Sequence, residues 1–182
     1  MAAQPNPGHL ALAIFSLPSV REVIAPGAAF TLITQNVDGL SRRAFSQVAA
    51  SKPELADEVA SAVNGSSICE MHGRLFDLVC TACGHREQNL HSPVCPALAG
   101  TENVFTRDEP EPHIDEKDLP RCSKCASLAR PGVVWFGEMP WFLEEIDELV
   151  EKADLCIVVG TSSTASAHLS CRPRDIALTR CH

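Results

Sequence analysis

The sequence predicts an α/β protein, with a partial Rossmann-like parallel sheet into which a small zinc-binding module is inserted. Two apolar segments, 28–34 and 154–159, each run into a polar or glycine-containing loop, as the strands of nucleotide-binding sheets do. A helical pattern directly precedes the second segment, which is the order of elements in such folds. Between the two segments, residues 80–125 carry cysteines in pairs, and this predicts the inserted module.

Length and charge exclude several classes of protein. The chain has 182 residues, of which 45% are hydrophobic, so it can bury a core in one domain or in one domain plus a small module. Fifteen Lys and Arg against 23 Asp and Glu give a net charge of −8, which repels phosphate backbones and anionic membranes. The apolar runs are far shorter than the roughly 20 residues that span a bilayer. We therefore expect no transmembrane helix, no nucleic-acid partner and no membrane partner.

Helix and strand signals place the first elements. Asn6 can cap a helix and Pro7 suits its first position, ahead of the Ala- and Leu-rich segment 9–15. Residues 28–34 have the β-branched and aromatic character of a buried strand. Residues 53–63 predict a modest helix.

The second half of the sheet is predicted after the cysteine-rich segment. Residues 133–136 predict a short apolar strand, and residues 140–153 repeat apolar side chains on one helical face. Residues 154–159 predict a fully buried parallel strand, whereas the end of the chain shows neither alternation nor a helical face. The predicted parts are the first part of the Rossmann-like lobe (1–79), the zinc-binding small module (80–132), the second part of the lobe (133–163) and a divergent C-terminal tail (164–182).

Nine cysteines in a chain whose first residues carry no secretory signal indicate metal-bound thiolates rather than disulfides. Cys80 and Cys83 form one CxxC pair, Cys122 and Cys125 the other, and together they match a closed tetrahedral site for structural zinc. Chance occurrence or redox chemistry is the alternative, although a redox site needs only one pair. The connection between the pairs exceeds the usual spacing of about 15–20 residues, so it must loop away from the metal. Cys95 is expected to be a packing residue or a free thiol.

Polar residues after the predicted strands are the candidate binding site. Gln35, Asn36 and Asp38 follow the first strand, at the position where α/β proteins bind ligands. His72 precedes the metal module. Taken alone, such a cluster is more often a solvated turn, and a single histidine is more often structural. A loop after the last strand could cradle phosphate with backbone amides and hydroxyls, and it consists of Gly160, Thr161, Ser162 and Ser163.

Five motifs, in this order, resemble the sirtuins, the NAD-dependent protein-lysine deacylases. They are Thr34-Gln35-Asn36-Val37-Asp38-Gly39-Leu40, Glu70-Met71-His72-Gly73, the double CxxC, Val134-Trp135-Phe136-Gly137-Glu138 and Val159-Gly160-Thr161-Ser162-Ser163. Further segments are similar to the class III branch, the mitochondrial desuccinylase and demalonylase type, and the resemblance covers residues 5–163. Those segments are Pro5-Asn6-Pro7-Gly8-His9, Cys80-Thr81-Ala82-Cys83-Gly84, Ser92-Pro93-Val94-Cys95-Pro96-Ala97-Leu98 and residues 130–138.

The resemblance implies an activity and a set of roles. The acyl group of a modified lysine (succinyl, malonyl, glutaryl or acetyl) would pass to the ADP-ribose of NAD, with release of nicotinamide. His72 would be the general base on a ribose hydroxyl, and one structural Zn²⁺ would be bound. Asn36 and Asp38 would hold the nicotinamide and Gln35 the ribose. The remaining cofactor contacts would come from residues 160–163, and the acylated substrate peptide would pair with Val134, Phe136, Gly137 and Glu138 by β-augmentation.

Two departures from the family limit this expectation. Sirtuins place a Gly-Ala-Gly phosphate loop, and in class III a Tyr and an Arg for the acidic acyl group, ahead of the region that matches, and this chain contains no Tyr. The family also continues with further elements after the last motif. We expect a product truncated at both ends, with weak or absent catalysis, and the alternative function is a non-catalytic zinc-containing module that binds proteins. The resemblance implies a mitochondrial location, with cytosolic or nuclear pools, although the first residues show no targeting signal.

Overall fold

The computed structural model describes residues 3–65, 67–101, 103–104, 112–160 and 175–179, the last five by their backbone. The chain divides into two compact units, Met1–Glu138 and Met139–His182, and each is described by itself.

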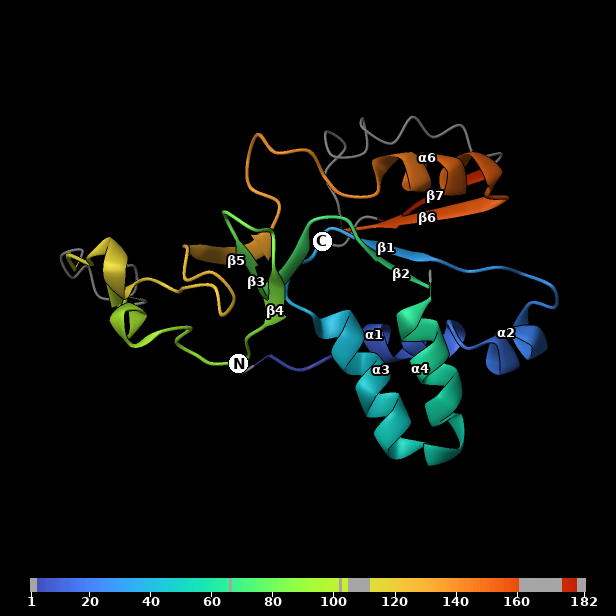
Figure 1. The fold of residues 1–182 in the computed structure, drawn as a ribbon. Helices are drawn as coiled ribbons and strands as arrows, with labels where there is room; N and C mark the ends of the chain where they lie inside the picture. Colours follow the sequence, from blue (N-terminus) through green and yellow to red (C-terminus); the bar gives the residue numbers. More distant parts are fainter. Residues whose placement is uncertain (1–2, 66, 102, 105–111, 161–174, 180–182) are drawn as a thin grey trace. The chain divides into compact units, whose positions relative to one another are not determined.

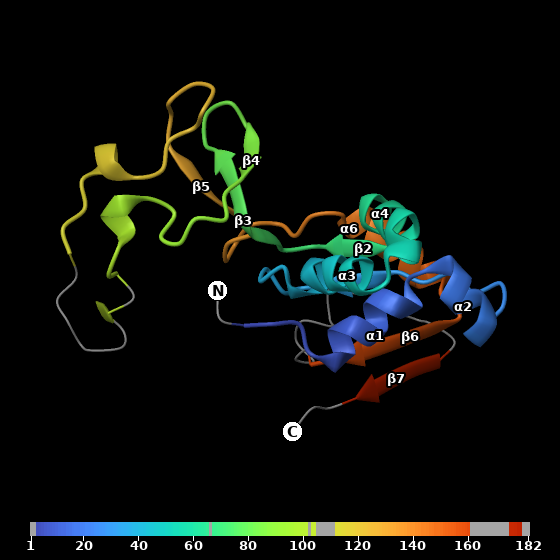
Figure 2. The ribbon, with the colours of Figure 1, turned by 90° about the horizontal axis from the view of Figure 1, so that it is seen from below.

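Helices form the core of the first unit. They are α1 (Pro7–Phe15), α2 (Pro18–Ile24), α3 (Leu40–Ser51), the short 3-10 helix η1 (Pro53–Leu55) and α4 (Ala56–Asn64). In Figure 2, α3 lies between α1 and α4. Leu17 and Phe45 are the largest apolar side chains that are fully buried there, among smaller residues such as Ala44 and Val48. The predicted start of the first helix is confirmed, because Asn6 Oδ1 accepts a hydrogen bond from the His9 amide at 3.0 Å.

Two strands of this unit pair in parallel. They are β1 (Leu32–Thr34) and β2 (Ile68–Glu70), in the register Thr34 opposite Glu70, and α3 and α4 connect them along the chain (Figure 1). This is a strand, helix, strand unit, in which the carboxyl ends of both strands lie at one edge. The predicted strand at 28–34 therefore exists only over its last three residues.

The rest of the first unit is built on an antiparallel sheet. Its strands are β3 (Gly73–Cys80), β4 (Arg86–Gln88) and β5 (Ala129–Val133), in the order β4-β3-β5. Two 3-10 helices, η2 (Pro96–Leu98) and η3 (Glu116–Asp118), lie in the connection from β4 to β5.

A bulge interrupts the pairing of β3 with β5. The register passes from Arg74 opposite Gly132 to Leu78 opposite Pro131, so residues 75–77 bulge out of that pairing. Gly132 is required at this point, because a Cβ atom there would lie 2.9 Å from the Cβ atom of Asp77.

The second unit contains α6 (Leu143–Lys152), β6 (Leu155–Val159) and β7 (Asp175–Thr179), and β6 and β7 pair in parallel. Helix α6 buries Ile146 and Val150, which confirms the predicted apolar face at these two positions, whereas Leu149 on the same face is exposed. Along β6 the side chains of Leu155, Ile157 and Val159 are exposed, so the prediction of a fully buried strand was wrong. A sheet face that carries apolar residues is buried only where another layer covers it.

One further sequence prediction needs correction, and some elements of the structure were not predicted. The strand predicted at 133–136 was wrong: β5 ends at Val133, and the chain then turns, with Glu138 donating its amide to the Trp135 carbonyl at 2.9 Å and Gly137 at a φ of +90°. Strand β7 was not predicted, because the end of the chain shows neither alternation nor a helical face, and a short apolar run needs no alternation in a parallel pair. Helices α2 and α3 were not predicted. The division of the chain into four parts stays a prediction.

Within the ranges that the structure describes, no helix is both long enough and apolar enough to cross a membrane.

Phe45 is the test of the helical core. We expect Phe45→Ala to lower the free energy of unfolding by about 3–5 kcal/mol, because the removed ring leaves a cavity among α1, α3 and α4. Val23, whose side chain in α2 is 83% exposed, provides the control, and Val23→Ala should change stability by less than about 0.5 kcal/mol. Urea denaturation followed by circular dichroism measures both. Equal effects of the two substitutions would contradict this description of the core.

Candidate functional site

Two loops meet at the carboxyl ends of β1 and β2. Strand β1 runs into residues 35–38, and β2 runs into the turn at 71–72. The Met71 amide donates to the Thr34 carbonyl at 3.1 Å, and the Leu75 amide donates to the Val37 carbonyl at 2.9 Å. These hydrogen bonds bring together two segments of the candidate site that are more than thirty residues apart in the sequence.

The ring of His72 contacts the first of these loops. Its Nδ1 atom lies 3.1 Å from the main-chain carbonyl oxygen of Gln35. A carbonyl oxygen can only accept a hydrogen bond, so the contact requires the proton on Nδ1. In the neutral ring the Nε2 atom then carries the lone pair, which is the state that a general base needs.

Asn36 and Asp38 are held by local hydrogen bonds at the start of α3. The Asn36 amide donates to Thr34 Oγ1 at 3.1 Å, and Asp38 Oδ1 accepts from the Leu40 amide at 2.9 Å. Gly39, at a φ of +68°, makes the left-handed turn into the helix. The Asn36 side chain is exposed, and in the described part of the chain its carboxamide has no hydrogen bond. The loop therefore carries the Asn36 carboxamide and the Asp38 carboxylate two residues apart, and hydrogen bonds constrain its backbone.

The predicted peptide-binding segment is connected to His72. The Val134 amide donates to the His72 carbonyl at 2.9 Å, directly after β5 ends. Glu138 closes the turn that follows, because its Oε2 accepts from the Trp135 amide at 3.1 Å and its Oε1 lies 2.9 Å from the Arg130 guanidinium. The Trp135 amide, and then Arg130, lower the pKa of Glu138. Phe136 at the tip of the turn is fully exposed.

The structure brings the four predicted metal ligands together. Their ligand atoms all lie within 4.8 Å of one another, and the closest Sγ atoms are 3.4 Å (Cys80 to Cys125), 3.5 Å (Cys125 to Cys83) and 3.7 Å (Cys83 to Cys122) apart. A tetrahedral Zn²⁺ with Zn–S bonds of about 2.3 Å spaces its sulfurs by about 3.8 Å. The arrangement therefore fits a single zinc ion. Cys95 stands apart from the cluster, with its Sγ 3.4 Å from the Asp118 carbonyl oxygen.

Backbone amides point at these sulfurs, as in zinc knuckles. The amides of Ala82 and Cys83 donate to Cys80 Sγ at 3.4 and 3.3 Å, and the Lys124 amide donates to Cys122 Sγ at 3.3 Å. The donated amide of Cys83 lowers the pKa of Cys80.

Two thiols of the cluster have pKa values that are shifted in opposite directions. The Ser127 amide lowers the pKa of Cys125 to about 6. At Cys83 the His85 amide favours the thiolate, but the neighbouring sulfurs of Cys80 and Cys125 outweigh it and raise the pKa to about 12. Four packed sulfurs cannot all ionise without a compensating charge, and a bound dication supplies it.

The remaining predicted cofactor residues, 160–163, follow strand β6 of the second unit. Gly160 follows β6 at a φ of +68°. Thr161, Ser162 and Ser163 lie outside the described residues.

Sequence reasoning gave no role to four charged residues beside the site, although Glu70 belongs to a quoted motif: Arg42, Glu70, Arg74 and Asp77. The two carboxylates are almost fully buried. The signal for them was present, since acidic residues inside apolar strands need a cationic partner.

Comparison with known proteins gives consistent relatives. The Sir2 family profile matches residues 54–167. The chain is similar to the mitochondrial NAD-dependent protein deacylase sirtuin-5 of Canis lupus familiaris, with 40% identity over 167 residues that cover 90% of this chain and 46% of that protein. It is also similar to an NAD-dependent protein deacylase of Thermococcus sibiricus, with 36% identity over 163 residues, 88% of this chain and 48% of that one.

Solved structures agree with the sequence relatives. The crystal structure of a Sir2 homologue in complex with NAD matches with a TM-score of 0.58 and 33% identity, covering 98% of this chain and 54% of that chain. The predicted fold class, a partial Rossmann-like parallel sheet with an inserted small zinc-binding module, is thus confirmed. The chain spans about half the length of the curated relatives it matches.

The metal site has a direct test. We expect the purified chain to contain one zinc ion and Cys122→Ser to lose it and unfold the segments around the cluster, because structural zinc contributes folding free energy. Cys95→Ser is the matched control and should keep both zinc and fold. Elemental analysis with circular dichroism measures the two effects. Stoichiometric zinc in Cys122→Ser would disprove the ligand set.

The turn closed by Glu138 should respond to pH. Because the folded pKa of Glu138 is lowered, the carboxylate stabilises this turn above its ordinary pKa, and that contribution is lost as the pH falls through the folded value. We expect the Trp135 amide resonance to titrate with a midpoint below the ordinary range of a glutamate. The transition should vanish in Glu138→Gln, as followed by NMR, and a Trp135 titration that survives this substitution would contradict the assignment.

Proposed function

The chain belongs to the Sir2 family, and from this premise we propose that the protein removes acyl groups from protein lysine side chains in a reaction that consumes NAD. Support comes from relatives that are named NAD-dependent protein deacylases. The resemblance to the class III branch favours acidic acyl groups such as succinyl, with acetyl as the second choice. The relatives that carry the name mitochondrial favour that compartment for this protein.

The contact between His72 and the Gln35 carbonyl carries the proposal. With the proton fixed on Nδ1, the neutral imidazole keeps Nε2 free to take a proton from a ribose hydroxyl. The main-chain carbonyl of Gln35 orients the His72 ring. The side chains of the same loop, 35–38, would contact NAD. The base and the ligand-binding loop are therefore joined by a direct hydrogen bond.

The loop has the polar groups that NAD would require. Bound NAD would supply the ribose carbon that accepts the acyl oxygen, with nicotinamide as the leaving group. The Asn36 carboxamide and the second oxygen of Asp38 can pair with a carboxamide as donor and acceptor. Gln35 would contact the ribose, and Gly160, Thr161, Ser162 and Ser163 would make further contacts to the cofactor.

Residues 134–138 would take the substrate peptide. Val134, Phe136, Gly137 and Glu138 would offer main-chain groups to an extended peptide, which suits an enzyme that acts on many sequences around a lysine. The hydrogen bond from Val134 to the His72 carbonyl would place that peptide next to the base.

The zinc ion would be structural. Four thiolates fill a tetrahedral shell and leave no position for a reactive water. Its contribution would be to hold β3 and β5, which carry His72 and Val134 at their ends.

His72→Ala tests the proposal. Turnover of a succinyl-lysine peptide and of an acetyl-lysine peptide is measured by mass spectrometry, with and without NAD, on the zinc-loaded chain. We expect NAD-dependent turnover that falls by about 10²–10⁴ in the variant, the usual contribution of a general base. His113→Ala is the control, since that side chain is 93% exposed, and it should keep full activity.

A folded, zinc-bearing wild-type chain without turnover would refute the enzymatic proposal. It would instead support the non-catalytic, protein-binding alternative.

A further inference from the structure

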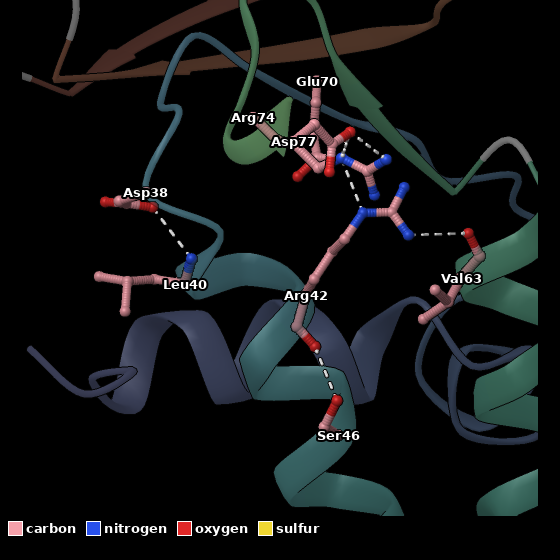
Figure 3. Close-up of polar contacts among 8 residues, drawn as sticks. All are labelled: Asp38, Leu40, Arg42, Ser46, Val63, Glu70, Arg74 and Asp77. Carbon is pink, nitrogen blue, oxygen red and sulfur yellow. Dashed lines mark hydrogen bonds and ion pairs between the residues drawn. The ribbon is translucent and has the colours of Figure 1, made fainter. Parts of the chain in front are cut away.

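Four charged side chains, drawn in Figure 3, alternate in sign along a continuous path, and two of them, Glu70 and Arg74, lie on either side of His72 in the sequence. Arg42 Nε lies 2.6 Å from Glu70 Oε2, and Arg74 Nε lies 3.8 Å from the same oxygen. At the far end, two nitrogens of Arg74 contact Asp77 Oδ2, at 2.9 and 2.6 Å. The path joins α3, the end of β2 and the start of β3.

The two carboxylates of this path are buried, with 8% of Glu70 and 6% of Asp77 exposed. Burying a carboxylate is costly unless a cation and hydrogen bonds compensate it. Two cations and two anions make the path neutral as a whole. In the part of the chain that the structure describes, no buried side-chain nitrogen or oxygen lacks a partner, while the Arg42 and Arg74 side chains stay about one third exposed.

Glu70 holds both ends of the His72 turn. It is the last residue of β2, and Arg74 follows two residues after His72, so their ion pair spans the turn at its base. Its other partner, Arg42, lies in the first turns of α3, just after the loop that carries Asp38. Arg42 also donates to the Val63 carbonyl at 3.4 Å, in the last turn of α4 where carbonyls lack helical partners.

Asp77 extends the connection into the β3 bulge. Within the bulge, the Leu75 amide donates to the Val37 carbonyl. The ion pair of Asp77 with Arg74 connects the last residue of the bulge to the residue that precedes it. The charged path therefore runs from α3, across the His72 turn, to the bulge of β3. The same bulge contacts the loop at 35–38 through Leu75.

Such a path contributes orientation more than stability. Well-packed apolar residues in place of a buried ion pair are often as stable or more stable, whereas the pair allows only one geometry. Catalytic groups have to be held within about 0.5 Å of their productive positions. The path combines short contacts of Arg42 with Glu70 and of Arg74 with Asp77, at 2.6 Å each, with a longer ion pair of Arg74 with Glu70 across the turn.

We propose that Glu70 is a positioning residue, which acts through Arg42 and Arg74 to hold the His72 turn against the loop at 35–38. The inference rests on the proposed function for its catalytic consequence. Its structural consequence is independent of that function: without the Glu70 charge, the hydrogen bonds that join turn and loop should open while the rest of the chain stays closed.

Hydrogen exchange measures this opening directly in the full zinc-loaded chain. In Glu70→Gln we expect the amides of Met71, Leu75 and Val134 to exchange at least about tenfold faster than in the wild type. Reference amides at the C-terminal cap of α1 (Ser16) and beside the zinc cluster (Thr81) should keep their rates. A merely structural role would speed all five amides by one common factor, and that result would overturn the proposal, as would unchanged rates at the three site amides.

Glu58→Gln is the matched control. Glu58 accepts two hydrogen bonds of 2.6 Å from Ser19 and so ties α2 to α4, but none of its hydrogen bonds found in the described ranges involves the turn or the loop. It should leave the three site amides and turnover unchanged. For Glu70→Gln we expect kcat for the acyl-lysine peptide to fall by at least about tenfold with KM nearly constant, since alignment and not binding is lost.

The two proposals fail in different ways. An inactive wild-type chain would refute the proposed function, and the exchange rates alone would then decide on Glu70. If Glu70→Gln does not fold, Arg42→Lys replaces it: the charge remains but the fork that reaches both Glu70 and Val63 is lost, and the same three amides should exchange selectively faster. Wild-type rates at those amides in Arg42→Lys would overturn the positioning role.

Discussion

The parallel pairing of β1 with β2 is the constraint on which the candidate site depends. The register that sets Thr34 opposite Glu70 makes both strands end together, so the loop at 35–38 and the turn of His72 emerge side by side. Helices α3 and α4 bridge the strands and bury Phe45 and Val48 in the process. Because side chains alternate along a strand, a shift of one residue would turn Glu70 away from Arg42. The register therefore decides which side chains meet at the candidate site.

Strand β3 transmits this order to the metal cluster. It begins at Gly73, directly after His72, and ends at Cys80, a predicted zinc ligand, so eight residues join the proposed base to the metal site. Strand β5 returns along it from Ala129 to Val133 and delivers Val134 to the His72 carbonyl. A structural ion can therefore support chemistry without touching it. Gly132 allows the close approach at the bulge, where any side chain would meet Asp77.

The sequence predicted those features of the structure that depend on residues close together in the chain. The cap at Asn6, the helix over 143–152 and the two cysteine pairs each have a spacing that the structure reproduces. What failed depends on contacts between distant residues. The strand expected at 133–136 stops early because β3 no longer pairs there, and β7 forms on β6 without any alternation of its own. The ion pair of Arg42 with Glu70 joins residues far apart in sequence, which no local pattern specifies.

The partner chosen for His72 explains why the charged path is needed. A carboxylate on Nδ1 would orient the ring and place a negative charge beside it, as in many acid–base sites. Here the partner is a main-chain carbonyl, which fixes the tautomer but adds no charge and moves with its own loop. Orientation of the ring therefore depends on how firmly the loop and the turn are held together. The ion pairs of the buried Glu70 with Arg42 and Arg74 would supply that rigidity from behind the turn.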